Sequence, residues 1–198
     1  MIGALPETLM VGGEEYHIRT DYRNILHVFE AFQDPELMQE EKWIVAIYLL
    51  FEDFFCDDDV LQAAQDGFDL GEAMKQISWF ISAGQPEKQV LEQPTYNWTQ
   101  DEQMIFSAVN KVAGRETREL EYLHWWTFLG YFNEVGEGTF SFIVGIRHKR
   151  NNSKKLEKHE QEFYNKNKEL VDIEKPMSKE EREAEEARKA KIKRVLRI

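Results

Sequence analysis

Hydrophobic residues recur at helical spacing along most of the chain, after one short strand-like stretch near its start. Within residues 9–18, apolar residues flank Gly12-Gly13, and two successive glycines supply the positive φ angles of a tight hairpin turn. From about residue 24 onward, apolar positions return every three or four residues, which indicates amphipathic helices. The pattern therefore predicts a mostly α-helical fold that begins with a short N-terminal β-hairpin.

Capping residues divide the helical part into segments. Thr20-Asp21 and Thr99-Gln-Asp-Glu102 match N-terminal caps, whereas Gly84 and Gly114 are residues at which helices commonly end. Helices are predicted over about residues 24–32, 35–55, 57–66, 70–81, 102–113, 120–134 and 139–150, and a polar helix is predicted to continue through the 150s and 160s. The side chains expected to face the core include Trp43, Trp79, Met104, Ile105, Ala108, Val109, Val112 and Trp125.

Composition divides the chain near residue 150. Residues 1–150 contain 23 of the 25 aromatic residues and carry a net charge of −15, whereas residues 151–198 carry +3. The first part has enough apolar surface for a compact helical bundle, but the second has too little to offset the entropy of ordering. We therefore predict a hairpin plus helical body over 1–150. Residues 151–198 are predicted to form a charged tail, helical or partly disordered, with a capping box at Ser178-Lys-Glu-Glu181.

The charge balance and the short apolar runs argue against two classes of partner. The chain carries 25 Lys and Arg against 37 Asp and Glu, a net charge of −12, so it would repel the phosphates of a nucleic acid. The longest apolar run, residues 43–51, is much shorter than the ~20 residues that a membrane-spanning helix needs. Cys56 is the single cysteine, and the N-terminus lacks a secretion signal. The sequence therefore predicts a soluble protein of a reducing cytoplasm.

The residue patterns do not indicate catalysis, a cofactor or a metal. The five histidines lack metal-ligand spacing, and His124, beside two tryptophans, is expected to be a hydrogen-bonded core residue. Cys56 precedes three aspartates, whose negative charge disfavours a reactive thiolate. Asp57-Asp58-Asp59 lacks the Gly and Glu of a calcium loop and is expected to cap a helix. We predict that the protein is not an enzyme.

Aromatic and basic residues are the candidates for partner binding. Helical geometry places Trp125 and Phe128 on one face and turns Trp126 away, so Trp126 either completes the core or forms an interaction surface. Six bases and no acid lie in residues 188–197; they either bind an acidic surface or RNA, or complement the helix dipole. The candidate partner-binding residues are Trp126, Tyr131, Arg188, Lys191 and Arg194.

Motifs in both halves of the predicted body occur together in a family of tailed phages. They are Leu5-Pro6, Val11-Gly-Gly-x-x-Tyr16-x-Ile18-x-Thr20-Asp21-Tyr22-Arg23, Asn97-Trp98, Asp101-Glu102-x-x-Ile105-Phe106, Leu123-His124-Trp125-Trp126-x-Phe128, and Ile143 to Arg147 before a basic stretch. The set resembles the "gene product fifteen" proteins of tailed phages of Gram-positive bacteria, over about residues 5–165. Leu-His-Trp-Trp in this order is among its most specific elements.

This resemblance implies a protein encoded beside the tape-measure gene, with the role of a tail assembly chaperone in the host cytoplasm. Such a chaperone binds the apolar helices of the tape-measure protein, keeps them soluble and self-associates along them. The acidic body and the basic tail suggest that the tail of one copy contacts the body of the next. Two alternatives remain: an acidic protein that binds or inhibits a host protein, and a tail-completion component of the virion.

Overall fold

Two strands and nine α-helices make up the part of the chain that the structure describes. The structure, a computed structural model, describes residues 3–86, 93–174, 176–181, 183–184 and 187–188. The elements are β1 (Thr8–Val11), β2 (Glu14–His17), α1 (Tyr22–Gln33), α2 (Gln39–Leu50), α3 (Asp57–Gln65), α4 (Leu70–Ile81), α5 (Glu102–Ala113), a 3₁₀ turn (Thr117–Glu119), α6 (Trp125–Asn133), α7 (Thr139–Asn151), α8 (Lys158–Lys166) and α9 (Lys168–Val171). The predicted mostly α-helical fold with an N-terminal hairpin is confirmed. Within these ranges, no helix has the length and apolar character needed to cross a bilayer.

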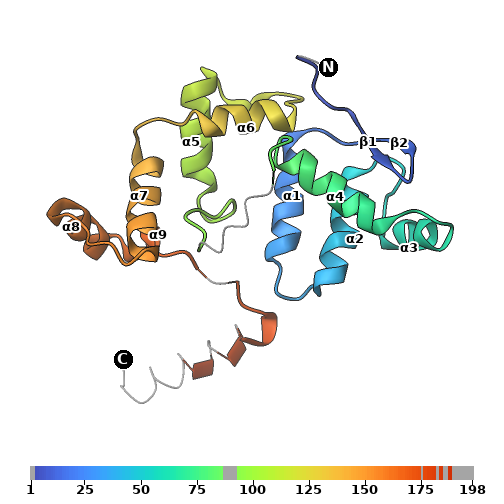
Figure 1. The fold of residues 1–198 in the computed structure, drawn as a ribbon. Helices are drawn as coiled ribbons and strands as arrows, with labels where there is room; N and C mark the ends of the chain where they lie inside the picture. Colours follow the sequence, from blue (N-terminus) through green and yellow to red (C-terminus); the bar gives the residue numbers. More distant parts are fainter. Residues whose placement is uncertain (1–2, 87–92, 175, 182, 185–186, 189–198) are drawn as a thin grey trace.

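The helices form two groups that meet at α1 and α6 (Figure 1). On one side, α2 packs against α1, α3 and α4, and β1 packs against α4. On the other side, α5 packs against α6 and α7, and α9 contacts both α7 and α8. Because α6 also packs against α1, it joins the two groups into one body.

The N-terminal hairpin has the predicted two-glycine turn. Strands β1 and β2 pair antiparallel with Val11 opposite Glu14, so Gly12 and Gly13 form the turn between them. Their φ angles are +62° and +85°, a conformation that glycine adopts without strain. The Gly12 N–H donates to a carboxylate oxygen of Glu72 at 2.6 Å, which attaches the turn to the first turn of α4.

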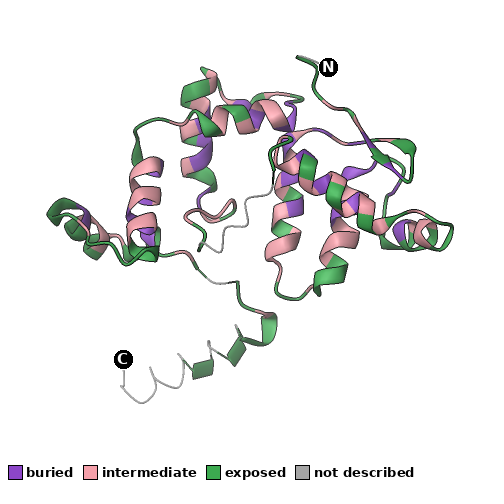
Figure 2. Ribbon diagram, viewed as in Figure 1, coloured by how far each residue is buried: buried purple, intermediate pink, exposed green. Residues whose placement is uncertain are grey.

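Aromatic rings form the core between the two groups. Tyr22 of α1 stacks on Phe128 of α6 with ring centroids 4.5 Å apart, and Trp125 of α6 lies 5.8 Å from Phe29 of α1. Trp98, which precedes α5, stacks on the same Phe29 ring at 5.5 Å. Figure 2 shows the buried residues along the inward sides of these helices. Ring pairs of this kind contribute ~0.5–1.5 kcal/mol each beyond the burial of their area.

Residues 20–22 lie alongside residues 123–125, so two of the sequence motifs meet in space. Asp21 and His124 form an isolated antiparallel bridge, and backbone hydrogen bonds of 3.0 and 2.8 Å flank it. The Asp21 carboxylate accepts from the Leu123 N–H at 3.0 Å and also caps α1. Helix α6 starts about five residues later than predicted, because the residues before it are extended along this pairing.

His124 is the hydrogen-bonded core residue that the sequence predicts. It is buried at the N-cap of α6, where its Nδ1 accepts from the backbone N–H of Trp126 at 3.0 Å. Its Nε2 lies 3.0 Å from the carbonyl oxygen of Pro6, so this nitrogen holds the proton and donates it. One ring nitrogen therefore caps α6, and the other holds the N-terminal segment against it.

Helix α2 is shorter than predicted at both ends. Asp34 closes a separate turn before the helix, because its carboxylate accepts from the backbone N–H two residues later at 2.8 Å. At the other end, the guanidinium of Arg19 donates to the carbonyl oxygens of Tyr48 at 2.8 Å and Phe51 at 2.5 Å. These bonds satisfy carbonyl groups that a longer helix would have used, and α2 ends at Leu50.

Two other expectations about helix ends are wrong, and one is confirmed. Thr99 does not cap α5, whose N-cap is Asp101. The polar helix predicted through the 150s is interrupted, because Ser153 has a φ of +53° and α8 begins only five residues later. Ser178 and Glu181 do form the predicted capping box, with reciprocal hydrogen bonds of 2.8 and 3.2 Å.

Part of the predicted tail, residues 158–174, contacts the rest of the protein. Val171 of α9 is fully buried. The side chain of Gln100 donates to the Asp172 carbonyl at 2.9 Å and accepts from the Glu174 N–H at 3.0 Å. Among the described residues, tertiary contacts therefore continue past residue 150, where the composition changes.

Candidate functional site

Two of the predicted partner-binding residues lie on α6. Trp126 is half-buried: its ring lies 5.4 Å from that of Trp79, and its indole N–H donates to the Phe80 carbonyl at 2.8 Å. Tyr131 is also half-buried and packs against the core. Both residues therefore have structural contacts of their own, and their role in binding a partner stays a prediction.

The basic candidates lie near the C-terminus. Arg188 is exposed, close to the end of the described chain. Lys191 and Arg194 lie outside the described residues. Their position relative to the aromatic residues of α6 stays a prediction as well.

One of the three tryptophans expected in the core is fully buried. Trp125 is 1% exposed, and Trp43 is half-buried against Phe32, with ring centroids 4.8 Å apart. The expectation for Trp79 is wrong, since 42% of it is exposed on the outer side of α4. Trp79 and Trp126 instead form an aromatic pair at the surface.

Helix α5 presents apolar residues on two faces. Ile105 and Val109 are buried in the core, as predicted. Met104, Ala108 and Val112 were expected there too, but the first two are half-buried and Val112 is 37% exposed. These three recur at i, i+4 and i+8, so they form one row along the helix. The apolar stripe of α5 is wider than the core requires.

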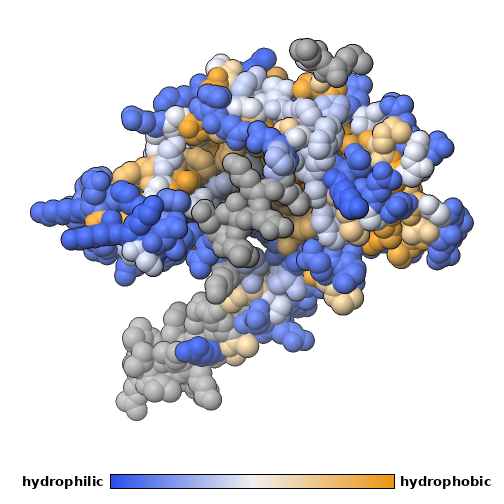
Figure 3. Space-filling model, in the orientation of Figure 1, coloured by the Kyte–Doolittle hydropathy of each residue, from blue (hydrophilic) through white to orange (hydrophobic). Residues whose placement is uncertain are grey.

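This row lines an open groove of about 550 Å³, which we call the α5 groove. Its opposite wall is the turn between α6 and α7, where Val135 and Phe140 supply apolar surface. Glu134 and Glu137 also line it. Hydrophobic surface is visible between α5 and α7 in Figure 3. The α5 groove therefore combines apolar walls with two acidic residues on one side and Lys111 of α5 on the other.

A smaller groove of about 290 Å³ lies on the other side of α5, facing α1. Arg118 stands at its edge, with the guanidinium 5.0 Å from the centroid of the Phe106 ring. Hydrogen bonds from Arg118 hold the pKa of Glu116 at about 2, so this pair stays charged at neutral pH. The apolar side chains that line the groove are Tyr22, Leu26, Trp98 and Phe106.

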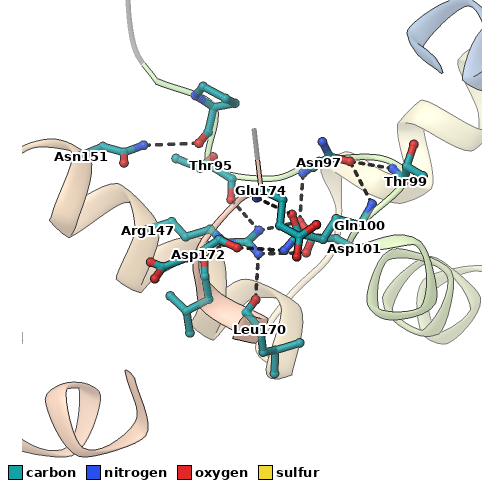
Figure 4. A network of polar contacts seen from close by, with 12 residues as sticks. Thr95, Asn97, Thr99, Gln100, Asp101, Arg147, Asn151, Leu170, Asp172 and Glu174 are labelled. Carbon is teal, nitrogen blue, oxygen red and sulfur yellow. Dashed lines mark hydrogen bonds and ion pairs between the residues drawn. The ribbon is translucent and has the colours of Figure 1, made fainter. Parts of the chain in front are cut away.

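A cavity of about 1020 Å³ adjoins a buried arginine (Figure 4). Arg147 is 3% exposed and donates to both carboxylate oxygens of Asp101, at 2.5 and 2.9 Å. It also donates to the carbonyl oxygens of Val171 at 2.6 Å, Leu170 at 3.0 Å and Thr95 at 3.2 Å. These bonds use all five N–H groups of the guanidinium, so none is free for a ligand. The network joins α7, α9 and the segment before α5.

The other buried polar side chains of the described residues take part in hydrogen bonds and ion pairs within the protein. No group of three or more metal-ligating side chains is gathered within the described ranges. Burial raises the pKa of Tyr96, which lines the cavity beside Arg147, so its hydroxyl stays protonated at neutral pH. The α5 groove is the best candidate site, because it combines accessible apolar surface with a regular helical repeat.

Comparison with protein families gives a match over residues 1–173 to the family described as bacteriophage Gp15 protein. The chain belongs to this family. Comparisons with curated proteins and with solved structures returned no match. The resemblance to phage gene product fifteen proteins is thereby confirmed, whereas a Gram-positive host and a neighbouring tape-measure gene stay predictions.

The match to the bacteriophage Gp15 family includes Arg147 and all the residues that accept its hydrogen bonds. It covers the paired segments at residues 20–22 and 123–125, and it ends just beyond Val171. Helices α8 and α9 therefore belong to the matched region together with the aromatic core. The α5 groove lies wholly within it.

Proposed function

We propose that this phage protein is a non-enzymatic tail assembly chaperone that binds helices of the tape-measure protein. In the host cytoplasm it keeps those helices soluble until the tail tube replaces it. Membership of the bacteriophage Gp15 family supports a role in phage structure or assembly. The observation that carries the proposal is the α5 groove, whose apolar wall repeats at helical spacing.

The dimensions of the α5 groove suit a bound helix. From Met104 to Val112 the wall rises by eight residue steps, about 12 Å, which is roughly two turns of a ligand helix. Side chains spaced at i and i+4 on one helix pack between the corresponding rows of another. Each apolar anchor buried there contributes about 1.5–3 kcal/mol, so a few anchors give reversible binding. Many copies along one tape measure would then cover it by multivalency.

The acidic character of the protein supports the same role. Glu134 and Glu137 line the α5 groove, and the whole chain carries a net charge of −12. Complexes that carry this charge repel one another, which keeps them in solution.

The test is co-expression with an apolar helical fragment of the tape-measure protein, followed by measurement of the soluble fraction. Val112→Lys removes an exposed part of the apolar row, and Ser107→Trp fills the α5 groove from an exposed position. Met10→Lys is the matched control, because Met10 is 46% exposed on β1, away from the groove. Wild type and the control should keep the fragment soluble. With either groove variant the fragment should aggregate, although the melting temperature of the variant itself is unchanged.

Two outcomes contradict the proposal at different points. A fragment that aggregates equally with and without the protein removes the chaperone role. A fragment that stays soluble equally with both groove variants removes the α5 groove as the binding site.

A further inference from the structure

The corner at which α2 meets α3 exposes large apolar side chains. Phe55 is 77% exposed, the highest value among the large hydrophobic residues that the structure describes, and Leu61 of α3 is 47% exposed. Tyr48 of α2 lies near the start of α3: burial first, and then the nearby Asp57 carboxylate, raise the pKa of this phenol. We call this surface the α2–α3 corner and define it by Tyr48, Phe55 and Leu61.

Phe55 is held in its exposed position. Its backbone N–H donates to the carboxylate of Asp59 at 2.9 Å, which fixes the chain just before α3. The guanidinium of Arg19 lies 5.5 Å from the centroid of the Phe55 ring and is itself anchored on carbonyl oxygens at the end of α2. The ring is therefore held at the surface, where it is available to pack against a partner.

The charge around the α2–α3 corner is strongly negative. Five acidic residues and no base lie between residues 52 and 59, and the guanidinium of Arg19 lies over the Phe55 ring within this segment. The corner therefore suits a ligand that combines apolar side chains with several positive charges. The acidic residues are Glu52, Asp53, Asp57, Asp58 and Asp59.

The C-terminal segment of this chain has that composition. Residues 187–198 contain six bases and no acid. Ile192, Val195 and Leu196 occur at i, i+3 and i+4, the spacing of one apolar helix face. In Figure 1, residues 183–184 and 187–188 lie far from α3, on the opposite side of the molecule. The described end of the chain therefore lies away from this corner of its own copy.

We propose that the α2–α3 corner of one copy binds residues 187–198 of a second copy. The contact joins two different surfaces, so it is head-to-tail and can add further copies in one direction. It does not depend on tape-measure binding, because it uses neither the α5 groove nor the helix row that lines it.

The test uses full-length variants of each side of the contact. A corner variant combines Phe55→Ser with Leu61→Ser, and a tail variant combines Ile192→Ser, Val195→Ser and Leu196→Ser. Met38→Ser is the matched control, because Met38 is 64% exposed at the opposite end of α2. Light scattering should show assemblies that grow with concentration for wild type and control, and monomers for each of the other variants alone.

Mixing the corner variant with the tail variant is the decisive measurement. One intact corner and one intact tail remain in the mixture, so it should form one-to-one dimers and nothing larger. Raising the salt from about 0.05 M to about 0.5 M should weaken this dimer about tenfold, because the charges are screened. Unchanged melting temperatures of the variants would show that folding is intact.

A monomeric wild type overturns the proposal, and so does a corner variant that assembles like wild type. A mixture that remains monomeric, or that grows beyond dimers, overturns the head-to-tail geometry. The tail variant also separates this inference from the proposed function, because as a monomer it still presents the α5 groove. If it holds the tape-measure fragment in solution while failing to self-associate, the two surfaces act independently.

Discussion

The aromatic core and the C-terminal region of this protein are held together by different interactions. In the core, Tyr22, Trp125 and Phe128 pack ring against ring, with centroids 4.5 to 5.9 Å apart. The C-terminal region, α7 to α9, is fastened by hydrogen-bonded charges, chiefly Arg147 and the pair Lys149–Glu160 at 2.6 Å. Ring contacts reach this region too, since Phe142 of α7 lies 5.1 Å from Phe163 of α8, but charged side chains make its buried hydrogen bonds.

This difference affects how each region responds to damage. An apolar core loses stability in proportion to the surface and volume removed, and its other contacts persist. A buried guanidinium becomes costly once a partner is lost, because the remaining charge is still out of water. The C-terminal region should therefore respond sharply to single polar substitutions, and the core to loss of bulk.

The largest expected effect tests the aromatic core. Trp125→Ala should lower the free energy of unfolding by about 3–5 kcal/mol, because the side chain is 1% exposed and leaves a cavity. Trp79→Ala is the matched control, since 42% of Trp79 is exposed, and it should cost less than about 1.5 kcal/mol. Denaturant unfolding measures both. Equal losses would show that Trp125 is not a core residue.

The second prediction tests the buried ion pair between Arg147 and Asp101. Arg147→Met should cost about 3 kcal/mol, because it leaves the Asp101 carboxylate buried without its cation. Arg147→Lys should recover part of the loss, since it keeps the charge but not the five-donor geometry. The same denaturant experiment applies. A neutral Arg147→Met would mean that the ion pair is replaceable by apolar contact.

The third prediction compares two truncations. Ending the chain after residue 151 removes buried Val171 and two carbonyl acceptors of Arg147, so we expect a loss of about 2 kcal/mol and a lower melting temperature. Ending it after residue 181 keeps all of these contacts and should leave melting unchanged. On composition alone, residues 151–198 would be dispensable for folding, and equal melting of both truncations would support that division.

The smallest expected effect concerns pH. The hydrogen bond from Lys149 lowers the pKa of Glu160 below its ordinary 4.5 and raises that of Lys149 above 10.5. The pair therefore contributes stability above the unfolded pKa of Glu160 and loses it as the pH falls through the lowered value. It also loses it when the pH rises through the raised pKa of Lys149.

Thermal melts across pH would reveal this contribution. Glu160→Gln should melt slightly below wild type at neutral pH, and the difference should vanish in acid below the usual carboxyl range. Glu162→Gln, an exposed position on the same helix, is the control and should show no such dependence. A constant difference down to acid pH would assign the effect to packing.

Local signals in the sequence were enough for some elements. Helix α4 begins at Leu70 as predicted, and α1 begins at Tyr22, directly after the predicted cap at Asp21; Asp21 and Asp69 cap the two helices with their own side chains. The left-handed Gly114 ends α5 in the same local way. Such helix boundaries depend on residues close in sequence, which a single chain displays directly.

Boundaries set by distant residues were not predictable in this way. Helix α2 ends where Arg19, about thirty positions earlier, donates to its carbonyl groups. The α5 groove shows a related limit. The row from Met104 to Val112 is visible in the sequence, but the wall facing it comes from the later turn between α6 and α7. The exposed Phe55 lies where a continuous helix had been predicted.

The fastening at Arg147 has a mechanical consequence. It grips the chain at Leu170 and Val171, directly before Asp172 and Glu174, which Gln100 holds. Traction on that end therefore loads short-range polar bonds first and peels α9, then α8, away from α7. The stacked rings between α1 and α6 do not carry this load. Under force, α9 and α8 therefore detach first, while the aromatic core remains folded.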